Sequence, residues 1–205
     1  MTLLVAVLLV GSRHARAELV AGRDYQALRT PLTTDNPAKL EVIEFFSYAC
    51  PRCAELHGLT AGWTSARDVA VRRVPVVMGR PDWSQLAILY YALESLGQLK
   101  RLDAAVFEAV KQNAVRLSDA GRIADWVAAQ GVDRKQYMNA ANSFAVTTKV
   151  KRAEVLARDY RLGSVPAIAI DGRYVVTGTT AMGGAQLFRL ANEVLDKARG
   201  ERRRP

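Results

Sequence analysis

The pattern of hydrophobic and polar positions predicts a strand, a helix and a second strand in the first third of the chain. Residues 39–48 are rich in β-branched and aromatic side chains, and this run ends at Ala49. Pro51 suits the first position of a helix, because its missing N–H has no partner there in any case. The residues that follow at helical spacing are Cys53, Leu56, Thr60 and Trp63. The valine-rich stretch 69–78 predicts the second strand.

The next part of the chain, residues 81–162, contains no strand-like run. Its apolar residues recur at spacings of three and four, which predicts several amphipathic helices. The clearest series is Leu86, Leu89, Tyr90, Leu93 and Leu96. Asp133 followed by Gln136 resembles a capping box, and Gly131 and Gly163 suit helix ends. The sequence therefore predicts that this region is a helical block.

The last part of the chain predicts a hairpin and a closing helix. Asp171-Gly172 separates two β-rich runs, 167–170 and 173–177, and this dipeptide is a strong hairpin signal. An amphipathic helix follows, carried by Leu187, Leu190, Ala191, Val194 and Leu195. The predicted order is thus β–α–β, a helical block, then β–β–α, which is an α/β protein.

Composition narrows the class of protein. The 205 residues include 50% hydrophobic residues, enough for a core, which excludes a disordered or collagen-like chain. Two cysteines are too few for a disulfide-stapled scaffold. The two histidines are His14 and His57, so a zinc site of four Cys or His ligands is not expected, and we expect no metal or cofactor.

The net charge of +9 does not indicate a nucleic-acid partner. Lys and Arg are spread along the chain beside acidic residues, which is typical of a solvated surface. A basic tail at residues 199–204 is the one local excess, and a membrane-surface or nucleic-acid role would rest on that tail alone. We therefore expect no nucleic-acid binding.

Residues 1–17 are predicted to be an export signal. Residues 3–10 form an apolar run that is too short to span a bilayer, and Ala15-Arg16-Ala17 has the small-x-small pattern of a cleavage site. No basic residue precedes the run, and charged residues crowd the cleavage region, so a buried N-terminal strand is the alternative. An exported chain would be a soluble protein in an oxidising compartment, the periplasm.

Both cysteines lie in Cys50-Pro51-Arg52-Cys53, where the first strand meets its helix. Cys50 at the helix N-cap would face free backbone N–H groups and the positive end of the helix dipole, which favour a thiolate. Cys53 lies one turn inside, where burial would keep its thiol protonated. An exposed nucleophile beside a sheltered thiol is the arrangement that thiol–disulfide exchange needs.

Other roles for these cysteines fit less well. A c-type haem site needs His directly after the second cysteine, and residue 54 is Ala. Zinc would need further ligands that the chain lacks. A purely structural disulfide would close too small a loop to constrain the unfolded chain.

Glu44 interrupts the apolar strand that leads to Cys50. Side-chain alternation puts Glu44 on one face with Val42 and Phe46, so we expect it inside the protein. A buried carboxylate tends to stay protonated, which makes Glu44 a candidate proton acceptor for Cys53. An acid at a frayed sheet edge is the alternative.

These motifs resemble the DsbA family of exported thiol:disulfide oxidases, within the thioredoxin superfamily. The resemblance covers about residues 22–199. It is carried by Gly22-Arg23-Asp24-Tyr25, by Val42 to Cys53 around the cysteine pair, and by Gly163-Ser164-Val165-Pro166-Ala167. The family fold is a thioredoxin fold with an inserted helical domain.

The resemblance divides the chain after the signal as follows. Residues 18–80 are the first thioredoxin-like part with the CxxC motif, 81–162 the helical insert, 163–199 the second thioredoxin-like part, and 200–205 a basic tail.

The resemblance also assigns residues to the site. It implies that Pro166 is a cis-proline facing the cysteines and that Val165 offers its backbone to a substrate strand; an ordinary trans proline that starts a strand is the alternative. Arg52 stands where the family usually has His, and it would tune the site through a charge that persists at every relevant pH. His57 is expected to be a partly exposed helix residue.

The expected function is to donate the Cys50–Cys53 disulfide to newly exported, reduced proteins. The family implies that a DsbB-type membrane oxidase linked to quinone restores the disulfide. We find no dimerisation segment and expect a monomer. Two other functions stay open: a disulfide reductase or isomerase of the same fold, and a holdase whose apolar groove binds peptides.

Overall fold

In the computed structural model, the described residues are 18–60, 63, 66–112, 119–178 and 183–203. The predicted signal and its cleavage site, residues 1–17, lie outside them. No helix within the described ranges is both long and apolar enough to cross a bilayer.

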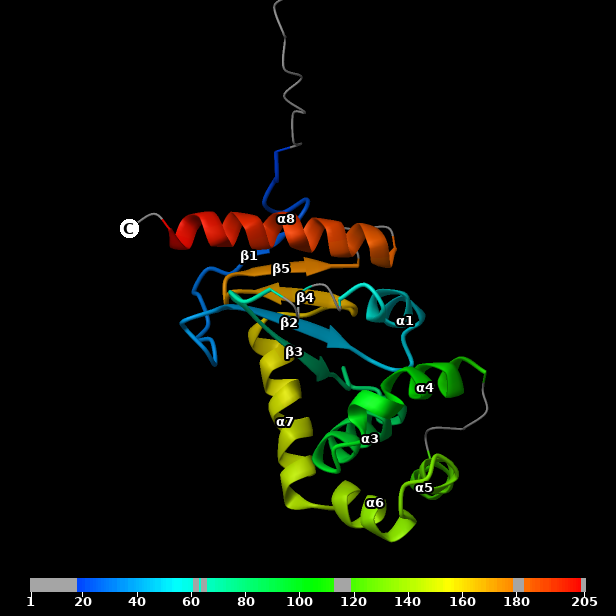
Figure 1. Cartoon of the computed structure of the whole chain (residues 1–205). Helices are drawn as coiled ribbons and strands as arrows, with labels where there is room; N and C mark the ends of the chain where they lie inside the picture. The colour runs from blue at the N-terminus through cyan, green and yellow to red at the C-terminus, as the bar shows by residue number, and fades with distance from the viewer. Residues whose placement is uncertain (1–17, 61–62, 64–65, 113–118, 179–182, 204–205) are drawn as a thin grey trace, which may run out of the picture.

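Five strands form one mixed sheet in the order β1-β5-β4-β2-β3 (Figure 1). Their bounds are β1 Gln26–Ala27, β2 Leu40–Phe46, β3 Val69–Pro75, β4 Ala167–Ile170 and β5 Tyr174–Thr177. β2 pairs with β3 in parallel, and the other pairs are antiparallel. Pro75 is tolerated because β3 is an edge strand.

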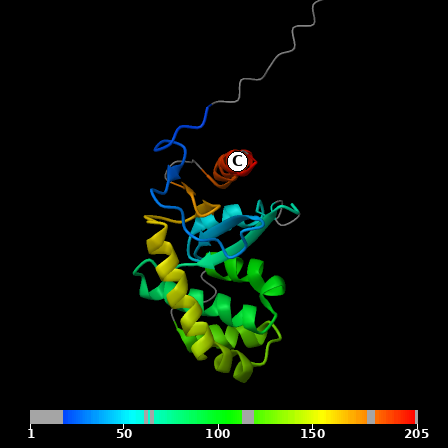
Figure 2. The same cartoon turned by 90° about the vertical axis from the view of Figure 1, so that its left-hand side faces the viewer.

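The helices are α1 Pro51–His57, α3 Pro81–Ser95, α4 Leu99–Lys111, α5 Ala120–Ala129, α6 Arg134–Ala141, α7 Phe144–Asp159 and α8 Gly184–Arg202. They segregate to two sides of the sheet: α1 and α8 lie together on one side, and α3 to α7 form a lobe on the other (Figures 1 and 2). The predicted order of elements is confirmed, with the short strand β1 as an addition.

The core divides at the sheet. Val42 of β2 packs in a cluster with Leu56 of α1 and Leu187 of α8. Ile43 and Phe45 belong to a second cluster that runs without a break from the sheet into the helical lobe. The lobe therefore shares its core with the sheet rather than folding around a core of its own. This continuity fixes the position of α4 relative to the start of α1.

One predicted helix boundary needs correction. The helix expected from Pro51 to Trp63 is interrupted, because α1 ends at His57 and a turn follows, in which the Leu59 N–H bonds to the Leu56 carbonyl and the Thr60 hydroxyl to the His57 carbonyl. α8 continues to Arg202, so residues 200–202 of the expected basic tail are helical. Arg202 pairs with the buried Asp171 and holds the last turn against the hairpin.

The hairpin turn depends on one glycine. Gly172 has φ +65°, a left-handed conformation that L side chains rarely adopt. A Cβ at this position would also collide with the backbone carbonyl of Leu32. Gly131 has a similar φ of +80° but faces open space.

We predict that Gly172→Ala lowers the free energy of unfolding by clearly more than Gly131→Ala. Backbone strain alone costs about 1–2 kcal/mol in each variant, and only Gly172→Ala adds the collision with Leu32. Urea unfolding of the two variants measures the difference. Equal losses would contradict the close packing of the hairpin against the segment that carries Leu32.

Candidate active site

Cys50 is the N-cap residue of α1, and Pro51 occupies the first turn, as its missing N–H allows. Both cysteines are free thiols and buried, Cys50 at 8% exposure and Cys53 at 0%. The helix therefore presents one sulfur close to the surface and a second one a turn below it.

The two sulfurs have opposite proton affinities. A hydrogen bond from the Cys53 thiol lowers the pKa of Cys50 to about 7, against the opposing effect of burial. The backbone N–H groups of Cys53 and Arg52 add to the lowering, and the Arg52 charge is the smallest of these contributions. Burial, followed by the hydrogen bond to Cys50, raises the pKa of Cys53 far above its ordinary value. The pair thus combines a thiol with a lowered pKa, Cys50, and a thiol with a raised pKa, Cys53.

The loop before β4 lies across from Cys50. The Val165–Pro166 peptide bond is cis, and the Cys50 Sγ is 3.5 Å from the Val165 carbonyl oxygen. Pro166 itself is buried. A backbone carbonyl is therefore available beside the reactive sulfur.

Arg52 extends away from the pair. Its side chain is exposed, and Nη1 donates a 3.0 Å hydrogen bond to the Gly178 carbonyl at the end of β5. The guanidinium thereby links α1 to the hairpin, in addition to its weak electrostatic effect on Cys50.

Glu44 is fully buried in the middle of β2, at 0% exposure. Burial raises the pKa of its carboxyl group, and the Arg73 charge opposes that rise. In the parallel register of β2 and β3, Glu44 lies directly beside Arg73, and Arg73 Nε donates a 3.2 Å hydrogen bond to its Oε2. The other carboxylate oxygen, Oε1, has no partner among the described groups.

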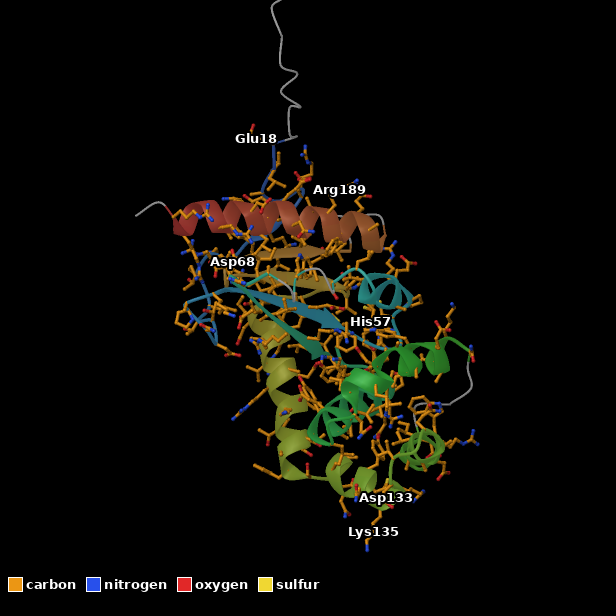
Figure 3. All side chains as sticks on the ribbon, in the orientation of Figure 1. Glu18, His57, Asp68, Asp133, Lys135 and Arg189 are labelled. Atoms are coloured by element: carbon orange, nitrogen blue, oxygen red, sulfur yellow. The ribbon has the colours of Figure 1, made fainter. Side chains whose placement is uncertain are left out.

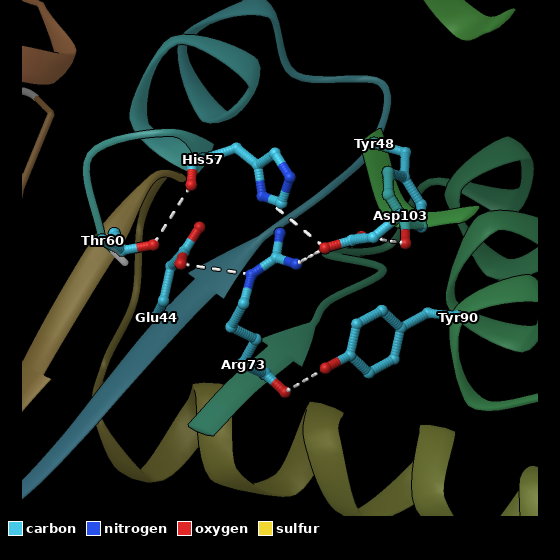
Figure 4. A network of polar contacts seen from close by, with 7 residues as sticks. All are labelled: Glu44, Tyr48, His57, Thr60, Arg73, Tyr90 and Asp103. Carbon is cyan, nitrogen blue, oxygen red and sulfur yellow. Dashed lines mark hydrogen bonds and ion pairs between the residues drawn. The ribbon is translucent and has the colours of Figure 1, made fainter. Parts of the chain in front are cut away.

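A second carboxylate approaches Arg73 from the helical lobe. Arg73 Nη1 forms an ion pair with Asp103 of α4 (Figure 4). Asp103 also accepts a 2.5 Å hydrogen bond from the Tyr48 hydroxyl, and its Oδ2 lies 3.6 Å from His57 Nδ1. One side chain of the insert thus contacts β3, the loop before Cys50 and the end of α1.

His57 is a partly exposed helix residue whose side chain is 27% exposed. Figure 3 shows it where α1 meets α4. Burial lowers the pKa of His57 despite the nearby Asp103. Its ring packs against Phe107 of α4, with centroids 5.0 Å apart.

Sequence analysis did not identify Arg73, Asp103 or Tyr48. Arg73 had a usable signal, because two arginines interrupt the valine-rich run that forms β3. Asp103 had none, since acids at helical spacing occur throughout the insert. Within the described residues, no group of three or more Cys, His, Asp or Glu side chains could hold a metal ion.

A cavity of about 540 Å³ adjoins Cys50 between α1 and α4. Tyr48, Phe107 and Val110 give it an apolar wall, while Glu55 and Glu108 contribute carboxylates. The reactive sulfur therefore opens onto a surface that the helical insert helps to form.

Comparison with known proteins gives a consistent result. Residues 41–194 match the DSBA-like thioredoxin domain family. The chain is 33% identical to the thiol:disulfide interchange protein DsbA of Pseudomonas syringae pv. tomato, covering 96% of this chain and 92% of that one. It is 35% identical to the Bordetella parapertussis protein of the same name, over 78% and 76% of the two chains.

Solved structures agree with the sequence matches. The crystal structure of Pseudomonas aeruginosa DsbA superposes with a TM-score of 0.84 at 30% identity, covering 91% of this chain and 97% of that one. Oxidoreductase DsbA from Xylella fastidiosa gives a TM-score of 0.80 at 28% identity, over 89% and 98%. The predicted thioredoxin fold with an inserted helical domain is confirmed.

The lowered pKa of Cys50 predicts a pH-dependent stability of the reduced protein. A thiol whose pKa falls on folding, from 9.0 to about 7, stabilises the folded state fully above pH 9 and loses this contribution as the pH falls through 7. We expect the difference in unfolding free energy between the reduced wild type and Cys50→Ser to grow by about 2–3 kcal/mol from pH 6 to pH 9.

Urea unfolding at the two pH values measures this difference. Both proteins share the other titrating groups, and burial, the main cause of the raised pKa of Cys53, is present in both, so the subtraction reports chiefly on Cys50. A difference that is the same at pH 6 and pH 9 would show that Cys50 titrates alike in folded and unfolded chains.

Proposed function

Because the chain belongs to the DSBA-like thioredoxin domain family, we propose that its Cys50–Cys53 disulfide is donated to newly exported, reduced proteins. The protein is a thiol:disulfide oxidoreductase with the thioredoxin fold, and the predicted family resemblance is confirmed. The two sulfurs support the exchange chemistry, the relatives support its direction, and the contacts of the surrounding residues support their roles.

Client oxidation takes two exchange steps. A client thiolate attacks the Cys50 sulfur, the bond between Cys50 and Cys53 breaks, and the Cys53 sulfur leaves with the electron pair and takes up a proton. The second client thiolate then attacks the client sulfur of the mixed disulfide. Cys50 leaves as a thiolate, and two electrons have passed from the client dithiol to the enzyme.

The observation that carries the proposal is the lowered pKa of Cys50. A thiolate that is stabilised by the Cys53 thiol and the first-turn N–H groups is a good leaving group and favours the reduced enzyme. An enzyme whose reduced form is favoured oxidises its clients. This asymmetry supports thiol–disulfide exchange, and the oxidase direction, rather than the reductase or isomerase direction, is supported by the relatives named thiol:disulfide interchange protein DsbA.

Glu44 is the proton carrier for Cys53. It is buried with Cys53 beneath the site, and the two groups interact electrostatically. Its raised pKa allows the protonated carboxyl group to supply a proton to the leaving Cys53 sulfur and to take one back when the disulfide is restored.

The client site is formed in part by four residues beside Cys50: Val165, Pro166, Pro51 and Arg52. The Val165 carbonyl, beside Cys50, offers a hydrogen-bond acceptor to an extended client segment. Pro166 has no N–H to compete at this point. Pro51 starts α1, and Arg52 holds α1 to the hairpin through Gly178.

The protein works in the periplasm, delivered there by the signal in residues 1–17, and a DsbB-type membrane oxidase linked to quinone reoxidises it. An oxidising compartment is where a dithiol oxidase finds reduced clients. The names of the relatives as thiol:disulfide interchange proteins support this setting. We further propose that the protein acts as a monomer.

Peptide binding without exchange is a second candidate function, favoured by the apolar cavity beside Cys50. The Cys50→Ser variant distinguishes the two functions. That variant loses the attacked sulfur and keeps the cavity, so a holdase would retain its peptide affinity while an oxidase would lose client oxidation.

We predict that Cys53→Ser accumulates mixed disulfides with reduced client proteins. The variant, loaded at Cys50 by a small disulfide, forms the client bond but lacks the intramolecular thiol that cleaves it in the reverse direction. Non-reducing gel electrophoresis detects the trapped complexes. Cys50→Ser combined with Cys53→Ser is the matched control and should trap none; equal trapping by the control would remove Cys50 as the attacked residue.

We also predict that the Cys50–Cys53 couple is more oxidising than cytosolic thioredoxin, whose potential is about −270 mV. Equilibration with glutathione buffers, followed by alkylation of free thiols, gives the potential. A value at or below that of thioredoxin would replace the oxidase assignment with a reductase.

A further inference from the structure

The charged cluster beneath the cysteine pair contains two carboxylates and one guanidinium. Arg73 lies between Glu44 of the sheet and Asp103 of the helical insert, and it contacts both. All three side chains are at least largely buried: exposed fractions are 0% for Glu44, 15% for Arg73 and 13% for Asp103. A single buried cation is therefore shared between two anions.

Arg73 is held in this place from several directions. Its guanidinium carbon lies 4.1 Å from the centroid of the Phe46 ring. The Tyr90 hydroxyl donates a 3.3 Å hydrogen bond to the Arg73 carbonyl, which fixes the backbone of β3 at this residue. The guanidinium cannot move to solvent without losing the Phe46 ring and both carboxylates.

Asp103 is held as firmly as Arg73. The Tyr48 hydroxyl donates to Oδ1, while Arg73 and His57 approach Oδ2. Tyr48 and His57 bracket the redox motif in sequence, one before Cys50 and one at the end of α1. Asp103 is thus fixed relative to the motif although it comes from another lobe (Figure 4).

We propose that Asp103 is a positioning residue for the redox centre, which holds Arg73 between two carboxylates and so limits how far the guanidinium stabilises the ionised form of Glu44. The inference rests on the proposed role of Glu44 as proton carrier. It assigns to the helical insert a part in the exchange reaction besides forming a surface next to Cys50.

The charges of Arg73 and Asp103 determine in which direction the pKa of Glu44 moves when Asp103 is replaced. Burial is the main cause of the raised pKa of Glu44; the charge of Arg73 opposes it, and the charge of Asp103 adds to it. Without the Asp103 charge, Arg73 acts on Glu44 alone, and the ionised form of Glu44 gains stability. Among the other titratable groups, Cys53 of α1 interacts with Glu44 itself. His57 of α1, Tyr48 of the loop after β2 and Tyr90 of α3 interact with Arg73 and Asp103.

The test titrates Glu44 directly. In reduced protein labelled with carbon-13 at the glutamate carboxyl groups, the Glu44 resonance is assigned by its loss in Glu44→Gln. We expect Asp103→Asn to lower the titration midpoint of Glu44 by about one pH unit. The pH at which client oxidation falls off should move down with it, because the protonated carboxyl group is then lost earlier.

Asp125→Asn is the matched control. Asp125 also pairs with an arginine of the insert, Arg134 at 2.7 Å, but its side chain is 67% exposed. It should leave the Glu44 midpoint unchanged. The thiolate absorbance of Cys50 should titrate alike in the wild type and in both variants, because the leading contributions to its pKa come from Cys53, burial and Arg52.

A second variant covers the case in which Asp103→Asn does not fold. Combining Asp103→Asn with Arg73→Met removes both charges of the pair, a change that buried pairs tolerate better than loss of one partner. Glu44 then loses its cationic neighbour, and its midpoint should rise above the wild-type value. The two variants therefore shift Glu44 in opposite directions.

The outcomes separate this inference from the proposed function. An unchanged Glu44 midpoint in folded Asp103→Asn, or no rise in the double variant, overturns the positioning role. Client oxidation that is unaffected by Glu44→Gln overturns the proton-carrier role instead, whatever the Glu44 midpoint does. A shifted midpoint with a matching shift in the rate profile supports both.

Discussion

The hydrogen bond that the buried Cys53 thiol donates to Cys50, reinforced by the free N–H groups of the first turn of α1, is the interaction on which the chemistry depends. It makes one sulfur an anion near neutral pH and leaves the other protonated. Both effects require the same placement at the helix start, where backbone donors are unpaired. A cysteine pair placed one turn further into α1 would lose these backbone N–H donors. It would then also lose the difference between the two pKa values.

Burial makes the pKa values of the two sulfurs unequal. It also disfavours the ionised form of the carboxyl group directly beneath them. Glu44 sits in a strand that is buried along its whole length, and a carboxylate there needs compensation. Arg73 provides it across the parallel pairing of β2 and β3. Burial nevertheless keeps the pKa of the Glu44 carboxyl group raised, and the charge of Asp103 adds to this effect while Arg73 opposes it.

The helical insert is therefore more than a cover for one face of the sheet. Its core is continuous with the core beneath β2, which fixes α4 against the active-site end of the molecule. From there α4 supplies Phe107 to the cavity beside Cys50 and Asp103 to the buried cluster. A thioredoxin-like sheet without the insert would keep the cysteines but lose both features.

Local patterns were sufficient for much of the molecule. Pro51 after a β-rich run located the start of α1 and put Cys50 at its N-cap, and Asp171-Gly172 located the hairpin, since these signals depend on neighbouring residues only. The lengths of the helices were harder to predict from local sequence patterns. No local signal marks the end of α1 at His57, and the last turn of α8 is held by an ion pair between Arg202 and Asp171, which lies far away in the sequence.

The sequence by itself determined the fold class, the unequal cysteine pair and a buried acid at residue 44, because spacing and strand alternation act over a few residues. Only the tertiary structure decided which cation meets that acid and which second acid shares it. Glu44, Arg73 and Asp103 lie far apart in the chain, and nothing local distinguishes Asp103 from the other acids of the insert. Their contact arises from strand register and from the packing of α4, which are properties of the whole fold.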